Sequence, residues 1–426
     1  MTTLLNTSSN IQTLCISTLQ QYPSINHILL LLLCCEYAPE HFTQYNAEQL
    51  DEIASSLRND EDWTTICQAT SFQDDSVNNS EYTLHAVLQN IQNLLHYSKT
   101  EGFADVIGYL LLEDSKSGDD AEAVTPTSIA NLVARLMQPQ ESNSVYDPAC
   151  RAGGLLAACS HHAVVDVFGQ EASQKRWITT QLTLMLYGKK PFGIKHSDCL
   201  LQPIHQENQL QRFDIVVGNP PWGRSVKNIE LKDNFQRFQW GMPSTRLDYA
   251  YISHMVASMC PENGRMAVLA QHGILFRSAT EGAIRQRLIE DNLLDAVIAL
   301  PEKMMPFMSA PLVLLIFKQQ RPDTSVLWLD ASKDYIADKY QNTLSEKHIN
   351  RICESYIQRE SIPQYATLSH FETIKANQFK LNIPLYIKPV QETAPSDLQT
   401  LQKEREQLMK QWERLQQKLD EQLQDS

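Results

Sequence analysis

The chain has 426 residues, of which 42% are hydrophobic, so it is long enough for two or three domains with a sizeable buried core. It carries 36 Lys and Arg against 50 Asp and Glu, which gives a formal net charge of -14. Proteins that grip DNA unaided usually carry a basic excess, so this balance argues against DNA binding by the chain alone. The acidic net charge does not exclude a local basic channel, or a partner that binds the DNA.

The cysteines and the hydropathy of the sequence further limit which kind of protein this is. The nine cysteines are scattered and never form a CxxC pair, which argues against a zinc site or a disulfide framework, and we expect no metal. The first residues lack the layout of a signal peptide. The longest apolar run, residues 28–35, is shorter than the about 20 residues that a membrane-spanning helix needs. The sequence therefore predicts a soluble, cytoplasmic protein with no membrane contact.

The N-terminal quarter of the chain is predicted to be helical. Residues 1–115 place apolar side chains at helical spacing and give almost no strand signal. We expect them to form a helical N-terminal domain. Residues 115–123 are polar and contain Gly118, which predicts a linker.

From residue 144 the pattern changes to short apolar segments that alternate with helical ones. The predicted strands are residues 145–147, 165–171, 194–198, 213–219, 265–270, 294–300, 312–317 and 326–329. The predicted helices between them include residues 174–187, 249–259 and 280–291. This alternation predicts an α/β fold, a doubly wound sheet with helices on both faces, in a domain that spans residues 116–390.

The last segment, residues 391–426, is rich in Gln, Glu and Lys and is predicted to form a helix. Five side chains fit the inward positions of a heptad pattern, which Arg405 interrupts: Leu401, Leu408, Trp412, Leu415 and Leu419. The helix either packs on its own domain or pairs with another chain. We favour pairing, because few domains end with an uncapped helix of this length and polarity.

The first candidate site follows the first predicted strand. Asp147 ends this strand, and a turn with small residues then leads into a helix. In doubly wound folds such a turn lets a cofactor approach the backbone, although the pattern alone is a weak signal. The turn contains Ala149, Cys150, Arg151 and Gly153.

Two further acidic residues end the next two predicted strands. Glu171 lies 18 residues past Gly153 (171 − 153 = 18), close to the spacing at which an acidic residue accepts hydrogen bonds from ribose hydroxyls. Asp198 has two interpretations of equal weight: it accepts a hydrogen bond from an adenine amino group, or it caps a helix.

The strongest candidate site is Asn219, Pro220, Pro221 and Trp222, at the end of an apolar strand. The prolines cannot donate hydrogen bonds, so backbone carbonyls are left facing outward. The Asn219 side-chain oxygen and the Pro220 carbonyl can both accept from one amino group, which aims its nitrogen lone pair at a methyl donor. Trp222 offers a face for stacking an extruded base. The alternative, a proline-terminated strand with a core Trp, explains fewer of the four sites.

With these motifs, residues 100–390 resemble the modification (methyltransferase) subunit of type I restriction–modification systems, a γ-ordered family of N6-adenine DNA methyltransferases. Further segments that carry the resemblance are residues 264–268, 272–277, 284–285, 297–301 and 381–386. The resemblance implies direct transfer of a methyl group from S-adenosyl-L-methionine to adenine N6, with no covalent intermediate.

The resemblance also implies a role for each site residue. The residues implied for the methionine part of the cofactor are Val124, Thr125, Pro126, Thr127, Asp147, Ala149, Cys150, Arg151 and Gly153. Glu171 would bind the ribose and Asp198 the adenine. The residues implied for the target base are Asn219, Pro220, Pro221 and Trp222.

The partners that the resemblance implies are DNA and a separate specificity subunit, contacted partly through the C-terminal helix. It leaves open a second copy of the chain and a restriction subunit. Such a division of labour would explain how an acidic protein works on DNA.

Three departures separate the chain from the family pattern: Arg151 where Gly is usual, Gln271 where Pro is frequent, and residues 305–308 in place of a Gly-containing stretch. If the turn needs a positive φ at Arg151, Arg costs roughly 1 kcal/mol there. We expect instead a negative φ that tolerates Arg. Two other functions remain: an amino-methyltransferase acting on RNA or protein, and a non-catalytic subunit that binds DNA or scaffolds a complex, for which Arg151 is the direct support.

Overall fold

The computed structural model describes most of the chain in two units. The described residues are 14–19, 24–72, 81–101, 103–115, 124–227, 229–306, 308–339, 341–387 and 405–412. Contacts divide the chain into Met1–Ile387 and Lys388–Ser426. The predicted linker is residues 115–123; Ser115 is the last residue of a described helix, and residues 116–123 lie outside the described residues.

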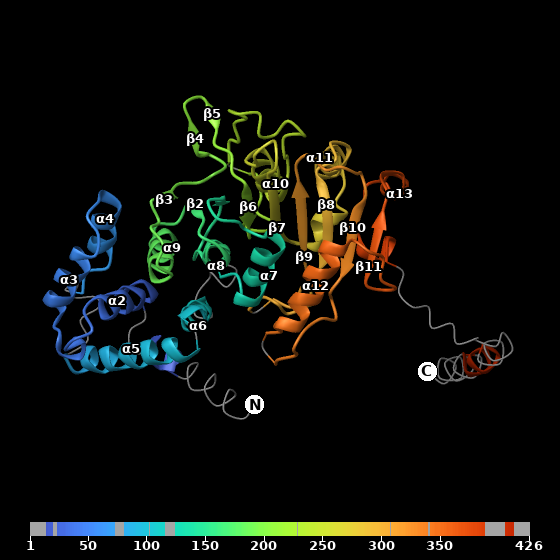
Figure 1. Cartoon of the computed structure of the whole chain (residues 1–426). Helices are drawn as coiled ribbons and strands as arrows, with labels where there is room; N and C mark the ends of the chain where they lie inside the picture. Colours follow the sequence, from blue (N-terminus) through green and yellow to red (C-terminus); the bar gives the residue numbers. More distant parts are fainter. Residues whose placement is uncertain are drawn as a thin grey trace, which may run out of the picture. The chain divides into compact units, whose positions relative to one another are not determined.

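A nine-stranded mixed sheet forms the centre of the first unit (Figure 1). Its strands, in spatial order, are β11 (Ala366–Ser369), β10 (Val326–Asp330), β8 (Leu294–Ala299), β9 (Leu312–Lys318), β7 (Arg265–Gln271), β6 (Ile215–Gly218), β1 (Ser144–Asp147), β2 (Asp166–Glu171) and β3 (Gly193–His196). Strands β3, β2, β1, β6 and β7 are parallel, so their carboxyl ends share one edge. The strand order reverses beside β1, where doubly wound folds bind ligands.

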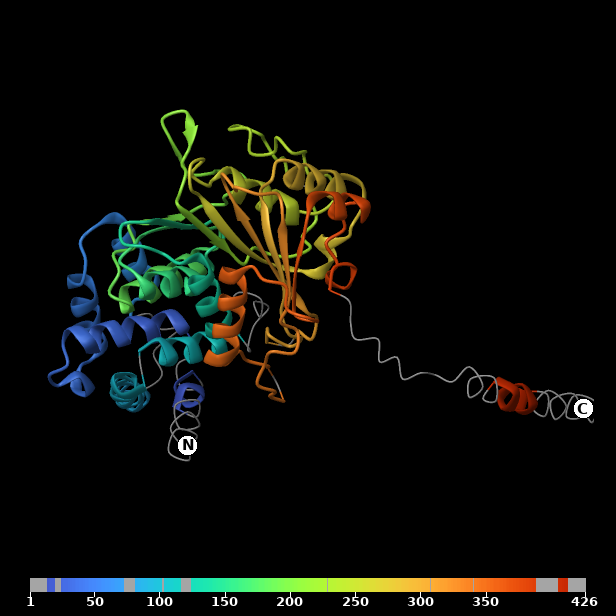
Figure 2. The same cartoon turned by 45° about the vertical axis from the view of Figure 1, so that its right-hand side comes forward.

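Helices cover both faces of this sheet, as the alternating side chains of the strands require (Figures 1 and 2). In β1, Val145 belongs to the core of one face and Tyr146 to the core of the other. The first face carries α7 (Thr127–Met137), α8 (Gly154–His162), α9 (Gln174–Leu186) and α12 (Glu346–Gln358). The second carries α10 (Asp248–Ala257), α11 (Ala279–Glu290) and α13 (Phe371–Ala376).

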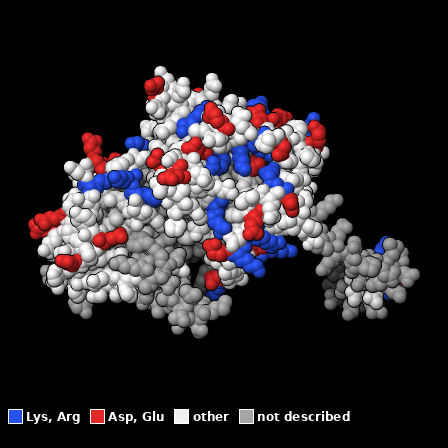
Figure 3. Space-filling model, in the orientation of Figure 1, with Lys and Arg blue, Asp and Glu red and all other residues white. Residues whose placement is uncertain are grey.

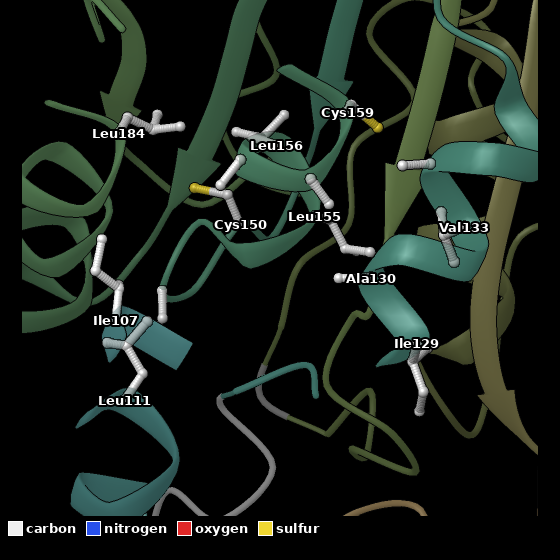
Figure 4. Packing of buried hydrophobic residues seen from close by; sticks show 14 of the residues in the cluster. Ile107, Leu111, Ile129, Ala130, Val133, Cys150, Leu155, Leu156, Cys159 and Leu184 are labelled. Carbon is white, nitrogen blue, oxygen red and sulfur yellow. The ribbon is translucent and has the colours of Figure 1, made fainter. Parts of the chain in front are cut away.

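The regular elements of the described N-terminal residues are all helices. They are α2 (Ile25–Tyr37), η1 (Phe42–Gln44), α3 (Ala47–Ser56), α4 (Glu61–Ala69), α5 (Glu81–Glu101) and α6 (Phe103–Ser115). Helix α2 packs on α9, where Asn26 Nδ2 donates to Lys175 O (3.1 Å) and Asn26 Oδ1 accepts from Thr179 Oγ1 (2.7 Å). Figure 4 shows Ile107 and Leu111 of α6 beside the turn that contains Cys150. These helices share one core with the sheet, and a separate domain of residues 1–115 stays a prediction.

The predicted strands and helices are confirmed within two residues, and the structure adds elements that the sequence analysis did not predict. Strand β9 is antiparallel to both of its neighbours. An antiparallel neighbour needs no crossover helix, so β8 and β9 join through a loop where strict alternation would place a helix. Other additions are β11, the hairpin of β4 (His205–Gln206) and β5 (Gln209–Leu210), η2 (His272–Leu275) and η3 (Ile383–Leu385).

The second unit contains a described helical stretch, residues 405–412. Leu408 and Trp412 are 65% and 64% exposed there, and Met409 is 53% exposed. The other members of the predicted heptad stripe, Leu401, Leu415 and Leu419, lie outside the described residues. Among the described helices of the chain, none is long and apolar enough to cross a membrane.

A buried ion cluster fastens the β8–β9 pair to α12. Asp295, 3% exposed at the start of β8, pairs with Lys318 (3.4 Å), Arg321 (3.1 Å) and Arg359 (2.9 Å), and accepts a hydrogen bond from Tyr356 Oη (2.7 Å). Burial alone would raise the pKa of Asp295, but the surrounding positive charges and the Tyr356 hydroxyl hold this pKa below its ordinary value.

We expect Asp295→Ala to lower the free energy of unfolding by roughly 3 kcal/mol, because it leaves buried cations without their counter-charge. Since the folded-state pKa is lowered, the contribution is present above the ordinary Asp pKa and disappears as pH falls through the lowered value. Urea unfolding at pH 7 measures the loss. Asp166→Ala, at the exposed start of β2, is the control; equal effects of the two substitutions would contradict the cluster's role.

Candidate active site

The four candidate motifs meet at the carboxyl edge of the sheet. Asp147 ends β1, Glu171 ends β2, Asp198 follows β3 and Asn219 follows β6. Two hydrogen bonds tie these loops together: Arg151 N donates to Glu171 Oε2 (3.0 Å), and Asn219 Nδ2 donates to Thr125 Oγ1 (3.1 Å). The edge therefore brings together residues that lie up to 94 positions apart in the chain.

The turn after β1 packs closely against its neighbours and contains a glycine with a positive φ. Gly153 has φ +80°, and a Cβ there would lie 3.2 Å from Thr180 Cγ2. Cys150 N donates to Gln170 O (3.0 Å), so the turn is also tied to β2. Burial raises the pKa of the Cys150 thiol well above its ordinary value, which makes it a packing residue and not a nucleophile.

Asp147 is 2% exposed, and its Oδ1 accepts from Ala149 N (3.0 Å). Burial raises the pKa of Asp147 to about 7, although the Ala149 amide and the positive charge of Arg151 act in the lowering direction. The carboxylate is therefore poised to gain a positively charged partner, because a charge brought close to it would offset the cost of its burial.

The expectation of a negative φ at Arg151 is wrong. Arg151 has φ +54° and is 8% exposed. Two contacts hold the strained backbone in place: Arg151 N donates to Glu171 Oε2, and Arg151 O accepts from Thr180 Oγ1 (2.6 Å). A left-handed conformation costs a non-glycine residue roughly 1–2 kcal/mol, which these contacts offset.

Glu171 and Asp198 are both engaged at the edge. Glu171 Oε1 accepts from Ser173 N (2.8 Å) and Arg176 Nε (3.2 Å). Asp198 Oδ1 accepts from Leu200 N (2.8 Å) and closes a turn; in the described chain no helix begins there, so the helix-cap interpretation is wrong. A carboxylate has about four acceptor sites, so both side chains keep capacity for a ligand hydroxyl or amino group.

Residues 124–127, which lead into α7 and are called the strip below, border a cavity of about 640 Å³. All four predicted strip residues line this cavity together with residues of the β1 turn: Val124, Thr125, Pro126, Thr127, Ala152 and Gly154. A Cβ at Gly108 of α6 would lie 2.6 Å from Thr127 Oγ1, so the N-terminal helices touch the strip directly. Asp147, Glu171, Asp198 and Asn219 are not among the residues that line this cavity.

The loop after β6 contains a buried oxygen that has no hydrogen-bond partner. Asn219 is 1% exposed, and its Oδ1 is buried with no hydrogen-bond donor. Trp222 is 8% exposed and donates through Nε1 to Leu269 O (3.1 Å), so the indole packs in the core. Its role in stacking a base stays a prediction. Gly223 N donates to Asp248 Oδ1 (3.2 Å), which ties the loop to α10.

Sequence reasoning missed a group of buried polar residues behind this edge. Tyr146 and Gln170 directly precede Asp147 and Glu171, and their hydroxyl and amide are hydrogen-bonded at 2.7 Å. His254 and Arg237 continue the same chain of contacts. Tyr146 and Gln170 could have been predicted as site residues because they lie beside the acidic ends of two strands. Nothing in the local sequence predicts such a role for Arg237.

Comparison with known proteins decides the family. The model of the N-6 DNA Methylase family matches residues 98–394, more than half of the chain. The chain belongs to this family. All four motifs of the carboxyl edge fall within the matched range.

The chain is also similar to individual members of restriction systems. The Type I restriction enzyme MjaVIII methylase subunit of Methanocaldococcus jannaschii is 28% identical over 344 residues, which cover 73% of this chain and 58% of that protein. The MpnII methylase subunit of Mycoplasma pneumoniae is 25% identical over 326 residues, 71% of this chain and 60% of that protein. The chain thus spans less than two thirds of the length of these relatives.

The solved structure of the type I restriction-modification system methyltransferase subunit from Streptococcus thermophilus has the same fold. It superposes with a TM-score of 0.68 at 21% identity, over 89% of this chain and 99% of that one. This likeness confirms the expected fold class.

The position of Arg151 generates a test of the cofactor turn. Because the charge of Arg151 lowers the pKa of Asp147, we expect Arg151→Gly to raise this pKa and to weaken S-adenosylmethionine binding at pH 7 by roughly threefold. At pH 8.5 a larger fraction of Asp147 is ionised in both proteins, so the deficit should shrink. Arg151→Lys, which keeps the charge, is the matched control. Calorimetric titration at the two pH values gives the measurement; tighter binding by Arg151→Gly at pH 7 would show that the side chain intrudes on the cofactor.

Proposed function

We propose that this chain is a site-specific DNA methyltransferase that transfers a methyl group from S-adenosyl-L-methionine to adenine N6, as the modification subunit beside a separate specificity subunit. The observation that carries the proposal is the buried Asn219 Oδ1, which has no donor in the described structure. A buried acceptor without a partner costs free energy, and an amino group of a ligand would satisfy it.

The residues of the edge supply hydrogen-bond acceptors that suit the amino and hydroxyl groups of the cofactor. Asp147 supplies a buried carboxylate for an amino group, Glu171 keeps an acceptor for ribose hydroxyls, and Asp198 keeps one for an adenine amino group. Gly153, at φ +80°, allows a ligand to lie against the backbone. The strip from Val124 to Thr127 and the turn would hold the methionine part. S-adenosylmethionine supplies an electrophilic methyl group carried on a sulfonium.

The loop after β6 would orient the acceptor nitrogen. Asn219 Nδ2 already donates to Thr125 Oγ1, so its Oδ1 faces away from that contact and accepts one N–H of the target amino group. The Pro220 carbonyl accepts the other. Two accepted hydrogen bonds would withdraw the nitrogen lone pair from the ring and make it the nucleophile. As the new N–C bond forms, the methyl carbon–sulfur bond would break, the sulfur would leave with the electron pair as a neutral thioether, and the nitrogen would pass one proton to water. Positioning and oriented dipoles supply the rate enhancement.

DNA binding is assigned to an assembly and not to this chain alone. The net charge is -14, and Figure 3 shows Lys and Arg interleaved with Asp and Glu on the visible face. A specificity subunit would supply the grip on DNA and the sequence reading. The exposed Leu408 and Trp412 of the C-terminal helix are the apolar side chains that we propose as its docking face.

The non-catalytic alternative draws support from the strained Arg151 at φ +54°. Against it stand the retained Asp147, Gly153, Glu171 and Asn219. A decayed site has no physical reason to keep Asn219 Oδ1 buried and unsatisfied, because any apolar replacement would be more stable. We therefore place the catalytic function first.

We expect Asn219→Ala to abolish methyl transfer while changing the dissociation constant of S-adenosylmethionine less than about threefold, because the amide faces the target base. Loss of one oriented acceptor should cost roughly 10²–10³ in kcat. Transfer of a radiolabelled methyl group to DNA, with calorimetry of the same protein, separates the two effects. Asn59→Ala, an exposed amide between α3 and α4, is the control. Wild-type transfer by Asn219→Ala would refute the assignment.

We expect the double substitution of Leu408 and Trp412 to Ala to prevent co-purification with the specificity subunit, and truncation before Ser396 to do the same. Both proteins should bind S-adenosylmethionine normally, because the first unit is unchanged. The matched control replaces Gln407 and Gln411, which are exposed on the same helix, with Ala. Unchanged co-purification of the apolar variants would show that the docking element lies elsewhere.

A further inference from the structure

A fully buried guanidinium lies behind the active-site edge without a carboxylate partner. Arg237 is 1% exposed and belongs to the segment of residues 229–247, which follows the Asn219 loop in the chain. Its Nη1 donates to Cys199 O (2.9 Å), and its Nη2 donates to Leu200 O (2.9 Å) and Lys232 O (3.1 Å). In the described structure Arg237 forms no ion pair, and its Nε has no acceptor. Its other hydrogen-bond partner is the neutral ring of His254, so in the described structure no hydrogen-bond partner of this buried charge carries a negative charge, which calls for a functional reason.

Two of the three carbonyls that Arg237 binds belong to the turn of Asp198. Cys199 and Leu200 follow Asp198 directly, and Lys232 lies within the 229–247 segment. One planar guanidinium therefore bridges the proposed adenine-binding turn and the segment after the target-base loop. The fork of Arg can hold several carbonyls in one plane, which the single ammonium of Lys cannot do.

A hydrogen-bonded chain extends from Arg237 to the other acidic strand ends. Arg237 Nη1 donates to His254 Nδ1 (3.3 Å), and this bond assigns the ring proton to Nε2, which lies 3.0 Å from Tyr146 Oη. Burial and the charge of Arg237 lower the pKa of His254 to about 3, so the imidazole is neutral. Tyr146 donates to Gln170 Oε1 (2.7 Å), and Gln170 Nε2 donates to Ser197 Oγ (2.7 Å).

A small apolar cluster reinforces this link. Cys199 and Leu200 from the Asp198 turn pack with Phe238 from the 229–247 segment and with Tyr251 of α10. Ala149, from the cofactor turn, lies against the same cluster. This cluster is separate from the two larger cores on the sheet faces. A movement of the Asp198 turn would therefore also displace side chains of the 229–247 segment.

We propose that Arg237 is a positioning residue that couples cofactor binding at the Asp198 turn to the ordering of the 229–247 segment, so that the target-base side of the site is organised once the cofactor is bound. The proposal rests on the proposed function, because it takes S-adenosylmethionine as the ligand of the turn. The physical basis is the shared set of acceptors: Asp198 cannot be fixed by a ligand without fixing the carbonyls of Cys199 and Leu200. Those carbonyls hold Arg237, and Arg237 holds the segment.

Amide hydrogen exchange of the full chain, with and without S-adenosylmethionine, tests the coupling without relying on activity. In the wild type we expect the cofactor to slow exchange in residues 197–204 and also in residues 229–247. In Arg237→Lys we expect protection to persist in residues 197–204 and to disappear in residues 229–247. Arg212→Lys is the matched control, because Arg212 also donates to a backbone carbonyl, that of Met259 (3.2 Å), from an exposed position.

A second variant guards against misfolding of Arg237→Lys. Tyr146→Phe removes the hydroxyl between His254 and Gln170 but keeps the ring stacked on Phe213 at 4.4 Å, and it should also weaken the protection of residues 229–247. Protection of both segments in both variants would overturn the proposal, as would wild-type protection confined to residues 197–204. No cofactor-induced protection anywhere in the wild type would instead contradict the proposed function itself.

Discussion

The hydrogen bond from Asn219 Nδ2 to Thr125 Oγ1 determines which way the amide of the active-site edge faces. With its NH2 group occupied, the amide leaves its buried oxygen without a donor, and we propose that this oxygen accepts from the target base. Thr125 is held in turn by the start of α7, where Pro126 O accepts from the amides of Ile129 and Ala130 (2.9 Å each). Helix α7 packs on α8, where Figure 4 shows Leu155 pointing toward Ala130. The orientation of one side chain thus depends on the packing of the whole first helical layer.

Two buried aspartates show how the fold separates stability from function. Asp295, at the amino end of β8, is surrounded by cations that hold its pKa below the ordinary value. Asp147, at the carboxyl end of β1, has one cation nearby in Arg151, and burial raises its pKa to about 7. The first carboxylate is satisfied within the chain and fastens helices to strands. The second is left under-compensated, which costs stability, and we propose that a positively charged ligand offsets this cost.

Much of the fold could be predicted from the sequence, because apolar runs and their spacing fix strands and helices locally. The antiparallel β9 could not, because its run of apolar side chains is the same for either strand direction. The positive φ of Arg151 was hidden for a different reason: tertiary contacts to Glu171 and Thr180 hold a conformation that Arg disfavours by itself.

The candidate site was predictable as a set of residues but not as a geometry. Asp147, Glu171, Asp198 and Asn219 end parallel strands, so their meeting at one edge follows from topology. The unsatisfied oxygen of Asn219 does not follow, since it depends on Thr125, 94 positions earlier in the chain. The contact between Arg237 and His254 could not be predicted either, because no local sequence pattern links these two residues.

We propose that this edge directs methyl transfer to the amino nitrogen of adenine. Mass spectrometry of nucleosides can test this on DNA from cells that carry the wild-type chain with its specificity subunit and from cells that lack the chain. We expect N6-methyladenine that depends on the chain. Methylated cytosine in its place, or DNA without any chain-dependent methylated base although the purified chain binds S-adenosylmethionine, would contradict it.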